Sequence, residues 1–275
     1  MTIAVRAPAT SANIGSGFDV AGAALALWNE LVVRDEPGVL DESHLGVRAF
    51  SVYASPSGRT FEWTSDIPRE RGLGSSAAVV ALGLVAGAVA AGVSPSVEEL
   101  YSAGLELEGH GDNLAAALAG GVCLTCDGTI HRVADSPPAV AVAVIPETRV
   151  STAASRAALP DSVPRADAVF DVGRASLLGA ALASGDEAMF AAALDDRLHE
   201  PYRVASAPHL TELRRDLPAG ALGATLSGSG PTVIVWSRAG EHDRVAAAVA
   251  ERFPEHRVAA LEASPEGAAA SARSS

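Results

Sequence analysis

The most informative stretch of this chain joins a glycine-rich loop to the start of an apolar helix and reads Pro68-Arg69-Glu70-Arg71-Gly72-Leu73-Gly74-Ser75-Ser76-Ala77-Ala78. The next residues are almost all Ala, Val, Leu and Gly, so we predict a buried helix over residues 75–91. The first N–H groups of a helix have no acceptor within it, and glycines let a ligand approach them closely. This phosphate loop, residues 68–78, therefore predicts a site for bound phosphate.

The loop differs from a Walker phosphate loop, which requires a Lys. This chain contains no Lys, and its 20 Lys or Arg positions are all Arg. The charge of a bound phosphate must then be met by backbone amides, Arg and a metal ion. Ser76 lies where its hydroxyl could bind Mg²⁺, a cation that prefers oxygen ligands. The alternative interpretation is an ordinary helix start built from Gly and Ser, with no ligand.

Composition narrows the classes of protein that remain. The chain has 275 residues, 48% of them hydrophobic and 19% charged, which is enough for one or two packed domains. A net charge of -13 leaves no basic surface for nucleic acid or an anionic membrane, so we expect neither as a partner. Two Cys make no disulfide framework, and the first residues lack the apolar core of a signal peptide. We therefore expect a cytoplasmic protein with a small ligand.

The rest of the chain mixes both kinds of secondary structure. We predict strands at residues 3–6, 30–34, 59–64, 121–126, 129–133, 139–145, 222–226, 232–236 and 257–261. We predict helices at residues 43–53, 94–108, 112–118 and 241–252, and a helical region at 153–217. Residues 10–17 are expected to form a loop, and the small polar residues from 262 onward a frayed tail. This mixture predicts an α+β fold.

Two further segments combine glycine with polar residues. Residues 8–19, the opening segment, contain Asn13 and Asp19, which would ordinarily be turn formers. Residues 226–232, the Gly228 loop, contain Gly228 and Gly230, and such glycines permit close contact with a backbone or a ligand. Taken alone, each is a weak indication of a site.

A third segment, residues 106–113, carries three carboxylates, an imidazole and an amide at one bend. Asp112 is readily explained as the N-cap of the following helix. Capping does not explain why Glu106, Glu108 and His110 crowd the same bend. A carboxylate from this acidic bend could complete a Mg²⁺ site with Ser76.

These segments, in this order, resemble the motifs of the GHMP kinase superfamily. The residues within each motif are similar to those of its homoserine kinase branch. Residues 8–19 are similar to PASSANLGPGFD, 71–78 to the GLGSSAA loop, 108–113 to EGHPDN, and 226–232 to SGAGPT. The resemblance spans positions 7 to about 237. It implies an N-terminal domain like ribosomal protein S5 domain 2 over residues 1–137 and a ferredoxin-like C-terminal domain over residues 138–262. Residues 263–275 would remain as a flexible tail.

The resemblance also implies a reaction, in which the γ-phosphate of ATP passes to the hydroxyl of L-homoserine on the way to threonine. ATP would lie on Pro68, Arg69, Glu70, Arg71, Gly72, Leu73, Gly74, Ser75, Ser76, Ala77 and Ala78, with Gly228 and Gly230. Ser76 and Glu108 match the Mg²⁺ ligands of the family, with Glu106 as the alternative. A homodimer is left open.

The acceptor needs groups for a carboxylate, an ammonium and a hydroxyl. The resemblance implies that Arg156 and Arg203 bind the carboxylate, a task that suits a guanidinium fork. It assigns Asn13 and Asp19 to the ammonium, and it sets His110, Asp112 and Asn113 around the hydroxyl. Asp112 aligns with the catalytic aspartate of related kinases, but positioning can supply most of phosphoryl transfer, so a general base and none at all both stay open.

The sequence departs from the family where Ser16 and Gly111 replace prolines, and residues 35–61 are too short to define an adenine pocket. Two alternatives remain. A GHMP kinase for another small alcohol is disfavoured because a neutral sugar needs no set such as Asp19, Arg156 and Arg203. A nucleotide or metabolite sensor without turnover is disfavoured because the phosphate loop is complete.

Overall fold

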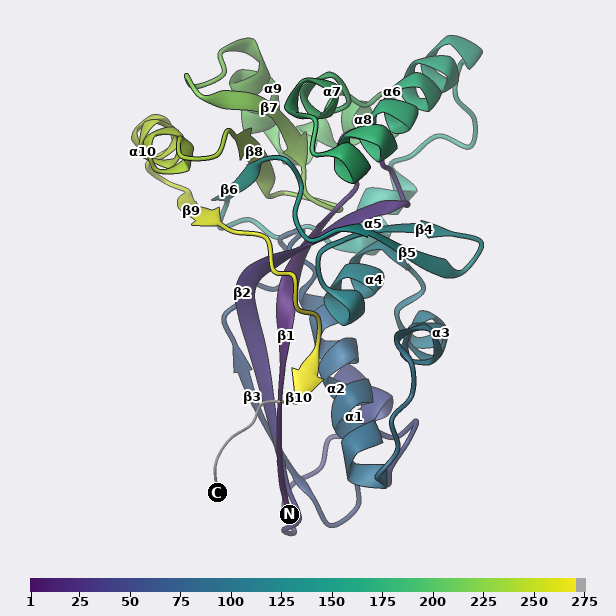
Figure 1. The fold of residues 1–275 in the computed structure, drawn as a ribbon. Helices are drawn as coiled ribbons and strands as arrows, with labels where there is room; N and C mark the ends of the chain where they lie inside the picture. Colours follow the sequence, from purple (N-terminus) through teal and green to yellow (C-terminus); the bar gives the residue numbers. More distant parts are fainter. Residues whose placement is uncertain (271–275) are drawn as a thin grey trace.

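The computed structural model describes residues 1–270, and its spine is a pair of long antiparallel strands, β1 (Thr2–Ala12) and β2 (Ala21–Arg34), seen in purple in Figure 1. The predicted strands at 3–6 and 30–34 are only parts of these. Residues 10–12 were expected in a loop but belong to β1. Ser11 and Ala12 carry little strand propensity, yet they are buried and paired with β2, so tertiary pairing overrides the local preference.

The first sheet runs in the order β10-β1-β2-β4-β5, and β3 (Thr60–Ser65) also pairs with β2. The expected hairpin around Asp127-Gly128 is confirmed as β4 (Val122–Cys126) and β5 (Thr129–Ala134). Four helices belong to this half: α1 (Leu45–Phe50), α2 (Ser75–Ala91), α3 (Val97–Glu108) and α4 (Asp112–Ala119). The central helix α2 contacts β1, β2 and all three other helices, which explains why it is apolar on every side.

The second sheet is antiparallel in the order β7-β8-β6-β9, with β6 at Val140–Ile145, β7 at Ala221–Leu226, β8 at Val233–Ser237 and β9 at Arg257–Leu261. The expected helical region resolves into α5 (Thr152–Ala157), α6 (Arg165–Ser184), α7 (Glu187–Ala192), α8 (Glu200–Arg203) and α9 (Pro208–Arg215). The last helix is α10 (His242–Arg252). Two packed sheets with their helices confirm the α+β class.

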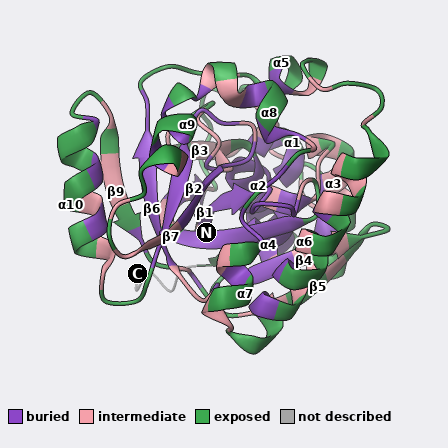
Figure 2. Cartoon of the chain, turned by 90° about the horizontal axis from the view of Figure 1, so that it is seen from above, coloured by how far each residue is buried: buried purple, intermediate pink, exposed green. Residues whose placement is uncertain are grey.

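Figure 2 shows the buried residues gathered along the central strands and on α2, with exposed residues on the outward faces of α7 and α10. One face of the second sheet packs on α9 and α10 through a core that includes Val142, Leu213 and Val245. Its other face contributes Trp236 to the core of the first sheet, so the two halves share apolar contacts. Within residues 1–270, no helix is both long and apolar enough to cross a membrane.

The expected flexible tail is wrong for residues 263–270. This segment returns to the first sheet, where β10 (Ala269–Ala270) pairs with Val5 and Arg6 of β1 (Figure 1, yellow). Ala263 bridges Leu25, and Ser264 is buried. An open sheet edge offers unpaired backbone groups, and pairing with them requires no particular side chain, so composition did not signal the contact. Residues 271–275 lie outside the described part of the chain.

Candidate active site

Hydrogen bonds to backbone carbonyls bring the three glycine-containing segments together. The phosphate loop contacts the opening segment through the Thr10 N–H, which donates to the Leu73 carbonyl at 3.2 Å. It contacts the Gly228 loop through Ser227, whose hydroxyl donates to the Gly72 carbonyl at 2.6 Å. The Gly228 N–H in turn donates to the Ala12 carbonyl at 2.9 Å. Segments more than 200 positions apart in sequence therefore form one continuous wall.

Two glycines of the phosphate loop are required by this packing. Gly72 and Gly74 have φ values of +78° and +65°, a region that other residues rarely adopt. A Cβ on Gly74 would lie 1.8 Å from the Thr10 hydroxyl oxygen, and a Cβ on Gly72 would lie 2.2 Å from the Ser227 carbonyl oxygen. The loop can hold its shape and its neighbours only with glycine at both positions.

The start of α2 presents free backbone donors to a cavity. The first N–H that bonds back toward the helix is that of Ala78, which donates to the Gly74 carbonyl at 2.9 Å. The preceding N–H groups, of Ser75, Ser76 and Ala77, have no acceptor of this kind, and no side chain caps the helix at Gly74. Ser75 and Ser76 line a cavity of about 200 Å³, which has the donors and the helix dipole that an anion needs.

The other residues predicted to hold ATP lie in different settings. Leu73, Ala77 and Ala78 are buried, so only their backbone can face a ligand. The Arg71 guanidinium donates to the carbonyls of Pro146 and Glu147, so it ties the phosphate loop to the second half of the chain. Gly230 packs against Leu226, and Pro68, the first residue of the loop, does not line this cavity.

The proposed metal ligands face each other. The Ser76 hydroxyl donates to Glu108 Oε2 at 2.7 Å, across the gap between α2 and α3. Within residues 1–270, Glu106 is exposed and makes no hydrogen bond or ion pair, so Glu108 is the carboxylate that meets Ser76. Burial raises the pKa of the Glu108 carboxyl, which indicates that a bound cation would be favourable there.

A hydroxyl and a carboxylate oxygen at this distance form a donor set that suits Mg²⁺. In the described part of the chain, no group of three or more His, Cys, Asp or Glu could hold a metal ion. The pair fits Mg²⁺ only as a partial site, completed by phosphate oxygens and water, which is the usual way this ion is held in kinases.

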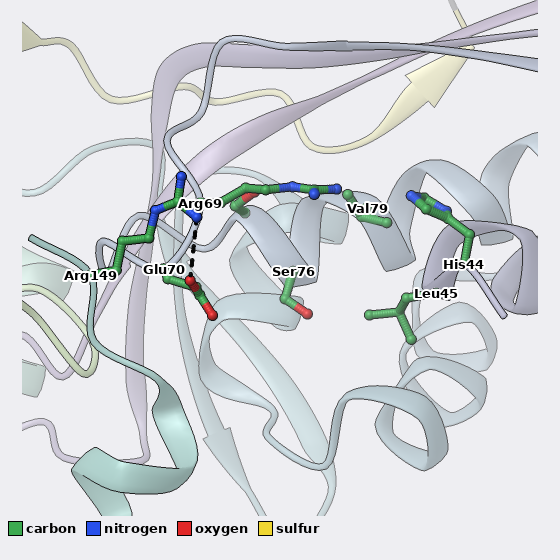
Figure 3. Close-up of a pocket in the computed structure, with 8 residues that line it drawn as sticks. His44, Leu45, Arg69, Glu70, Ser76, Val79 and Arg149 are labelled. Atoms are coloured by element: carbon green, nitrogen blue, oxygen red, sulfur yellow. Dashed lines mark ion pairs between the residues drawn. The ribbon is translucent and has the colours of Figure 1, made fainter. Parts of the chain in front are cut away.

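A larger cavity of about 510 Å³ adjoins the start of α2 (Figure 3). Arg69 and Glu70 of the phosphate loop line it, and Arg149 from the second half of the chain pairs with Glu70 at 3.9 Å. His44 and Leu45 lie at the opposite side, at the start of α1. Sequence reasoning missed His44 and Arg149, because neither stands in a recognisable motif. The short segment left undefined at residues 35–61 supplies this wall.

The residues predicted to bind the acceptor meet at a narrow cavity of about 50 Å³. Its walls include every one of them, namely Asn13, Asp19, His110, Asp112, Asn113, Arg156 and Arg203. Thr152 and Ser229, which sequence reasoning missed, also line it, as does Glu108. Because Glu108, Asn113 and Gly228 line the phosphate cavity as well, the two cavities share a wall.

Two of these residues pair with each other directly. Arg156 donates two hydrogen bonds to the Asp19 carboxylate, at 2.6 and 3.0 Å. Asn13 uses both ends of its amide within the protein, because it accepts from the Asp19 N–H at 2.8 Å and donates to the Gly228 carbonyl at 3.0 Å. Asn13 therefore holds the loop that carries Asp19, and contact with an ammonium would need this bonding to change.

Asp112 is the first helical residue of α4, and Gly111 takes the N-cap position that we expected for Asp112. Its carboxylate accepts the Asn113 N–H at 2.7 Å. Burial raises the pKa of Asp112 and outweighs that hydrogen bond, with Asp19 adding to the rise. Thr10, which sequence reasoning also missed, donates to the Asn113 side-chain oxygen at 2.6 Å and so orients it. The arrangement can orient a hydroxyl and accept a proton.

Two family models and several curated proteins match this chain. Residues 43–121 match the GHMP kinases N terminal domain, and residues 178–255 match the GHMP kinases C terminal family. The chain is 39% identical to the homoserine kinase of Clavibacter michiganensis, covering 91% of this chain and 87% of that protein. It is 38% identical to that of Moorella thermoacetica, covering 90% and 92%.

Solved structures show the same similarity. A homoserine kinase from Cytophaga hutchinsonii superposes with a TM-score of 0.89 at 27% identity, covering 98% of this chain and 97% of that one. The L. major mevalonate kinase, 16% identical, has a TM-score of 0.74 over 95% of this chain and 96% of that one, and it shows a shared fold alone.

Proposed function

This chain belongs to the homoserine kinase family of the GHMP kinases, and we propose that it transfers the γ-phosphate of ATP to the hydroxyl of L-homoserine, giving O-phospho-L-homoserine and ADP. One observation carries the proposal: the phosphate cavity at the start of α2 and the cavity lined by Asp19, Arg156 and Arg203 share a wall. A triphosphate in the first cavity would end beside an acceptor in the second. This proximity is what an in-line transfer requires.

The charges of the acceptor cavity support an amino acid as the substrate. Arg156 and Arg203 provide guanidinium groups for a carboxylate, and Asp19 provides a carboxylate for an ammonium. The Asp19 and Arg156 side chains are paired with each other, so an entering zwitterion can exchange one ion pair for two of its own. A neutral alcohol would leave these charges without new partners, which disfavours it.

We infer that Mg²⁺ is required and that Ser76 and Glu108 hold it. The ion would neutralise charge on the phosphates during transfer. The N–H groups at the start of α2 would stabilise the rest of that charge. The larger cavity between Arg69 and His44 would take the nucleoside part of ATP.

Asp112 is our candidate for the group that receives the proton of the acceptor hydroxyl. Its raised pKa, caused chiefly by burial, makes it a better base near neutral pH than an exposed carboxylate. Asn113 and His110 line the same cavity and would orient the hydroxyl. From the family relationship we further propose a cytoplasmic enzyme of threonine biosynthesis.

The experiment is an ADP-release assay on the purified protein with a panel of small alcohols. We expect ADP release that needs both Mg²⁺ and L-homoserine, with little turnover of neutral sugars or mevalonate. A folded sample that turns over a different alcohol would refute the choice of substrate. A sample that binds ATP but releases no ADP with any acceptor would favour the sensor instead.

A further inference from the structure

Arg203 differs from the other arginines near the acceptor cavity in the groups that hold it. Its side chain is 4% exposed, and among residues 1–270 no carboxylate forms an ion pair with it. Arg156 pairs with Asp19, and Arg214 pairs with the buried Glu200 at 2.5 Å. A carboxylate partner cancels much of a guanidinium charge, so of these three arginines only Arg203 keeps its charge free of a direct ion pair with a described residue.

Neutral acceptors hold Arg203 instead. Its Nε donates to the Ser155 carbonyl at 3.4 Å, and Nη1 donates to the Gly228 carbonyl at 3.3 Å. Nη1 also lies 3.2 Å from Nδ1 of His199, one helical turn earlier in the chain. No residue in the described part of the chain accepts a hydrogen bond from Nη2, and Arg203 lines the acceptor cavity.

The contact with Arg203 determines the protonation of His199. A guanidinium can only donate, so Nδ1 must accept, and the ring is neutral with its proton on Nε2. His199 is fully buried, and burial, followed by the Arg203 charge, holds its pKa well below the usual value. A hydrogen bond with the Gly15 backbone opposes this lowering of the pKa, and Asp196 Oδ1 lies 3.8 Å from Nε2, on the side of the ring where the proton lies.

The His199 ring is also fixed in place. Phe18 stacks on it with the ring centres 4.9 Å apart, and the same Phe18 ring lies 5.3 Å from the guanidinium carbon of Arg203. The His199 N–H donates to the Asp196 carboxylate at 2.9 Å, which anchors the backbone where α8 begins. The imidazole is therefore a rigid acceptor rather than a mobile side chain.

We infer that His199 is a positioning residue for the reaction: it holds Arg203 through a neutral acceptor, so that the guanidinium keeps both its orientation and its full charge for the carboxylate of the amino-acid substrate. The inference rests on the proposed function. A carboxylate at position 199 would hold Arg203 equally well but neutralise it. An apolar side chain at position 199 would remove one hydrogen-bond acceptor from Arg203 Nη1. The guanidinium could then rotate.

Three variants separate these effects: His199→Asn, His199→Leu and His199→Asp. Asn retains a neutral acceptor, so we expect its KM for L-homoserine to stay within about threefold of the parent. The Leu and Asp variants should each raise the KM for L-homoserine about tenfold or more. This factor corresponds to the free energy of one hydrogen bond to a charged group. KM for ATP should not change. An unaltered homoserine KM in the Leu variant would overturn the inference.

A substrate without the carboxylate distinguishes positioning from damage to the fold. With 3-amino-1-propanol, which has the hydroxyl and the amine, His199→Leu should leave kcat/KM close to the parent value. An equal loss on both substrates would show that the residue serves only the structure. The matched control is His209→Leu, another buried histidine, which packs beside Phe253 away from the acceptor cavity and should leave the homoserine KM unchanged.

A measurement on the unaltered protein needs no turnover. The ¹⁵N shifts of the His199 ring should show an unprotonated Nδ1 and a protonated Nε2 from about pH 6 to 8. A proton on Nδ1, or a doubly protonated ring, would overturn the inference. If the protein did not phosphorylate homoserine at all, the proposed function would fail, and this spectrum would still decide how His199 meets Arg203.

Discussion

The phosphate end and the acceptor end of the site are built in different ways. The phosphate end comes mainly from one continuous stretch, residues 68–78, and it offers backbone N–H groups shaped by Gly72 and Gly74. The acceptor end is made of charged side chains from distant parts of the chain, such as Asp19, Arg156 and Arg203. In the proposed function, backbone amides bind a phosphate, whose shape does not vary, whereas selection of one alcohol requires side chains that the fold must assemble.

The strongest test of the phosphate end is Gly74→Ala. The new Cβ would lie 1.8 Å from the Thr10 hydroxyl, so the loop must move, and a shift of about 1 Å can cost about 100-fold in rate. We expect kcat/KM to fall by at least about that factor for both substrates in the ADP-release assay.

Its control lies at the other end of the same helix. Gly92 has φ of +68° with open space around its Cβ position, so Gly92→Ala should cost about 1 kcal/mol of stability and leave activity intact. Equal losses of activity in both variants would mean that backbone strain, and not the close approach to Thr10, is what matters.

The acceptor end is tested by Arg203→Ala. Loss of a charged partner should raise KM for L-homoserine about 50-fold, with KM for ATP nearly unchanged. Steady-state kinetics with each substrate varied in turn measures the two constants. Arg215→Ala, at an exposed arginine of α9, is the control and should change neither. A parallel rise in both KM values would contradict the separation of the two ends.

The boundary between the two ends is tested by Glu108→Gln. Removing the charge opposite Ser76 should raise the Mg²⁺ concentration for half-maximal activity about tenfold, because an amide is the weaker ligand. Glu106→Gln, two positions earlier on the same helix, should have no effect because Glu106 is exposed. A larger effect of Glu106→Gln than of Glu108→Gln would show that Glu106, not Glu108, binds the metal.

The last prediction concerns Asp171, a buried acid of α6 whose carboxylate accepts the Arg197 N–H. Burial, with the nearby Asp196 carboxylate, raises the pKa of Asp171 to about 6. Between about pH 4 and 6, Asp171 keeps a proton in the folded protein that it has released in the unfolded chain. The free energy of unfolding therefore falls as pH rises through this range. In the Asp171→Asn variant the amide oxygen can still accept the Arg197 N–H. Because the amide does not titrate, the free energy of unfolding no longer falls for this reason.

Urea unfolding at pH 4.5 and pH 7.5 measures the difference. Relative to the parent, the Asp171→Asn variant should gain about 1 to 3 kcal/mol in free energy of unfolding on going to the higher pH. Asp167→Asn, on the same helix but partly exposed, serves as the control and should show a much smaller gain. A gain of the same size in both variants would mean that net charge, not burial, sets the dependence.

Local sequence was sufficient where a structure depends on neighbours in the chain. The helix predicted at residues 75–91 has the same bounds in α2, and the hairpin at Asp127-Gly128 is present. The return of residues 263–270 to β1 was missed because edge pairing needs no particular side chain. The roles of His44 and His199 were missed because each depends on groups brought near by folding, a helix start for one and Arg203 for the other.

By itself, the amino-acid sequence determined the chemistry that was available: a glycine-rich helix start without Lys, an acidic bend, and motifs in the order of one family. Tertiary structure alone decided which groups meet. It chose Glu108 over Glu106 as the partner of Ser76, paired Asp19 with Arg156, and placed Arg203 against the His199 imidazole. The physical reason is range: helix starts and turns depend on a few neighbouring residues, whereas ion pairs and shared cavities depend on packing between segments far apart in the chain.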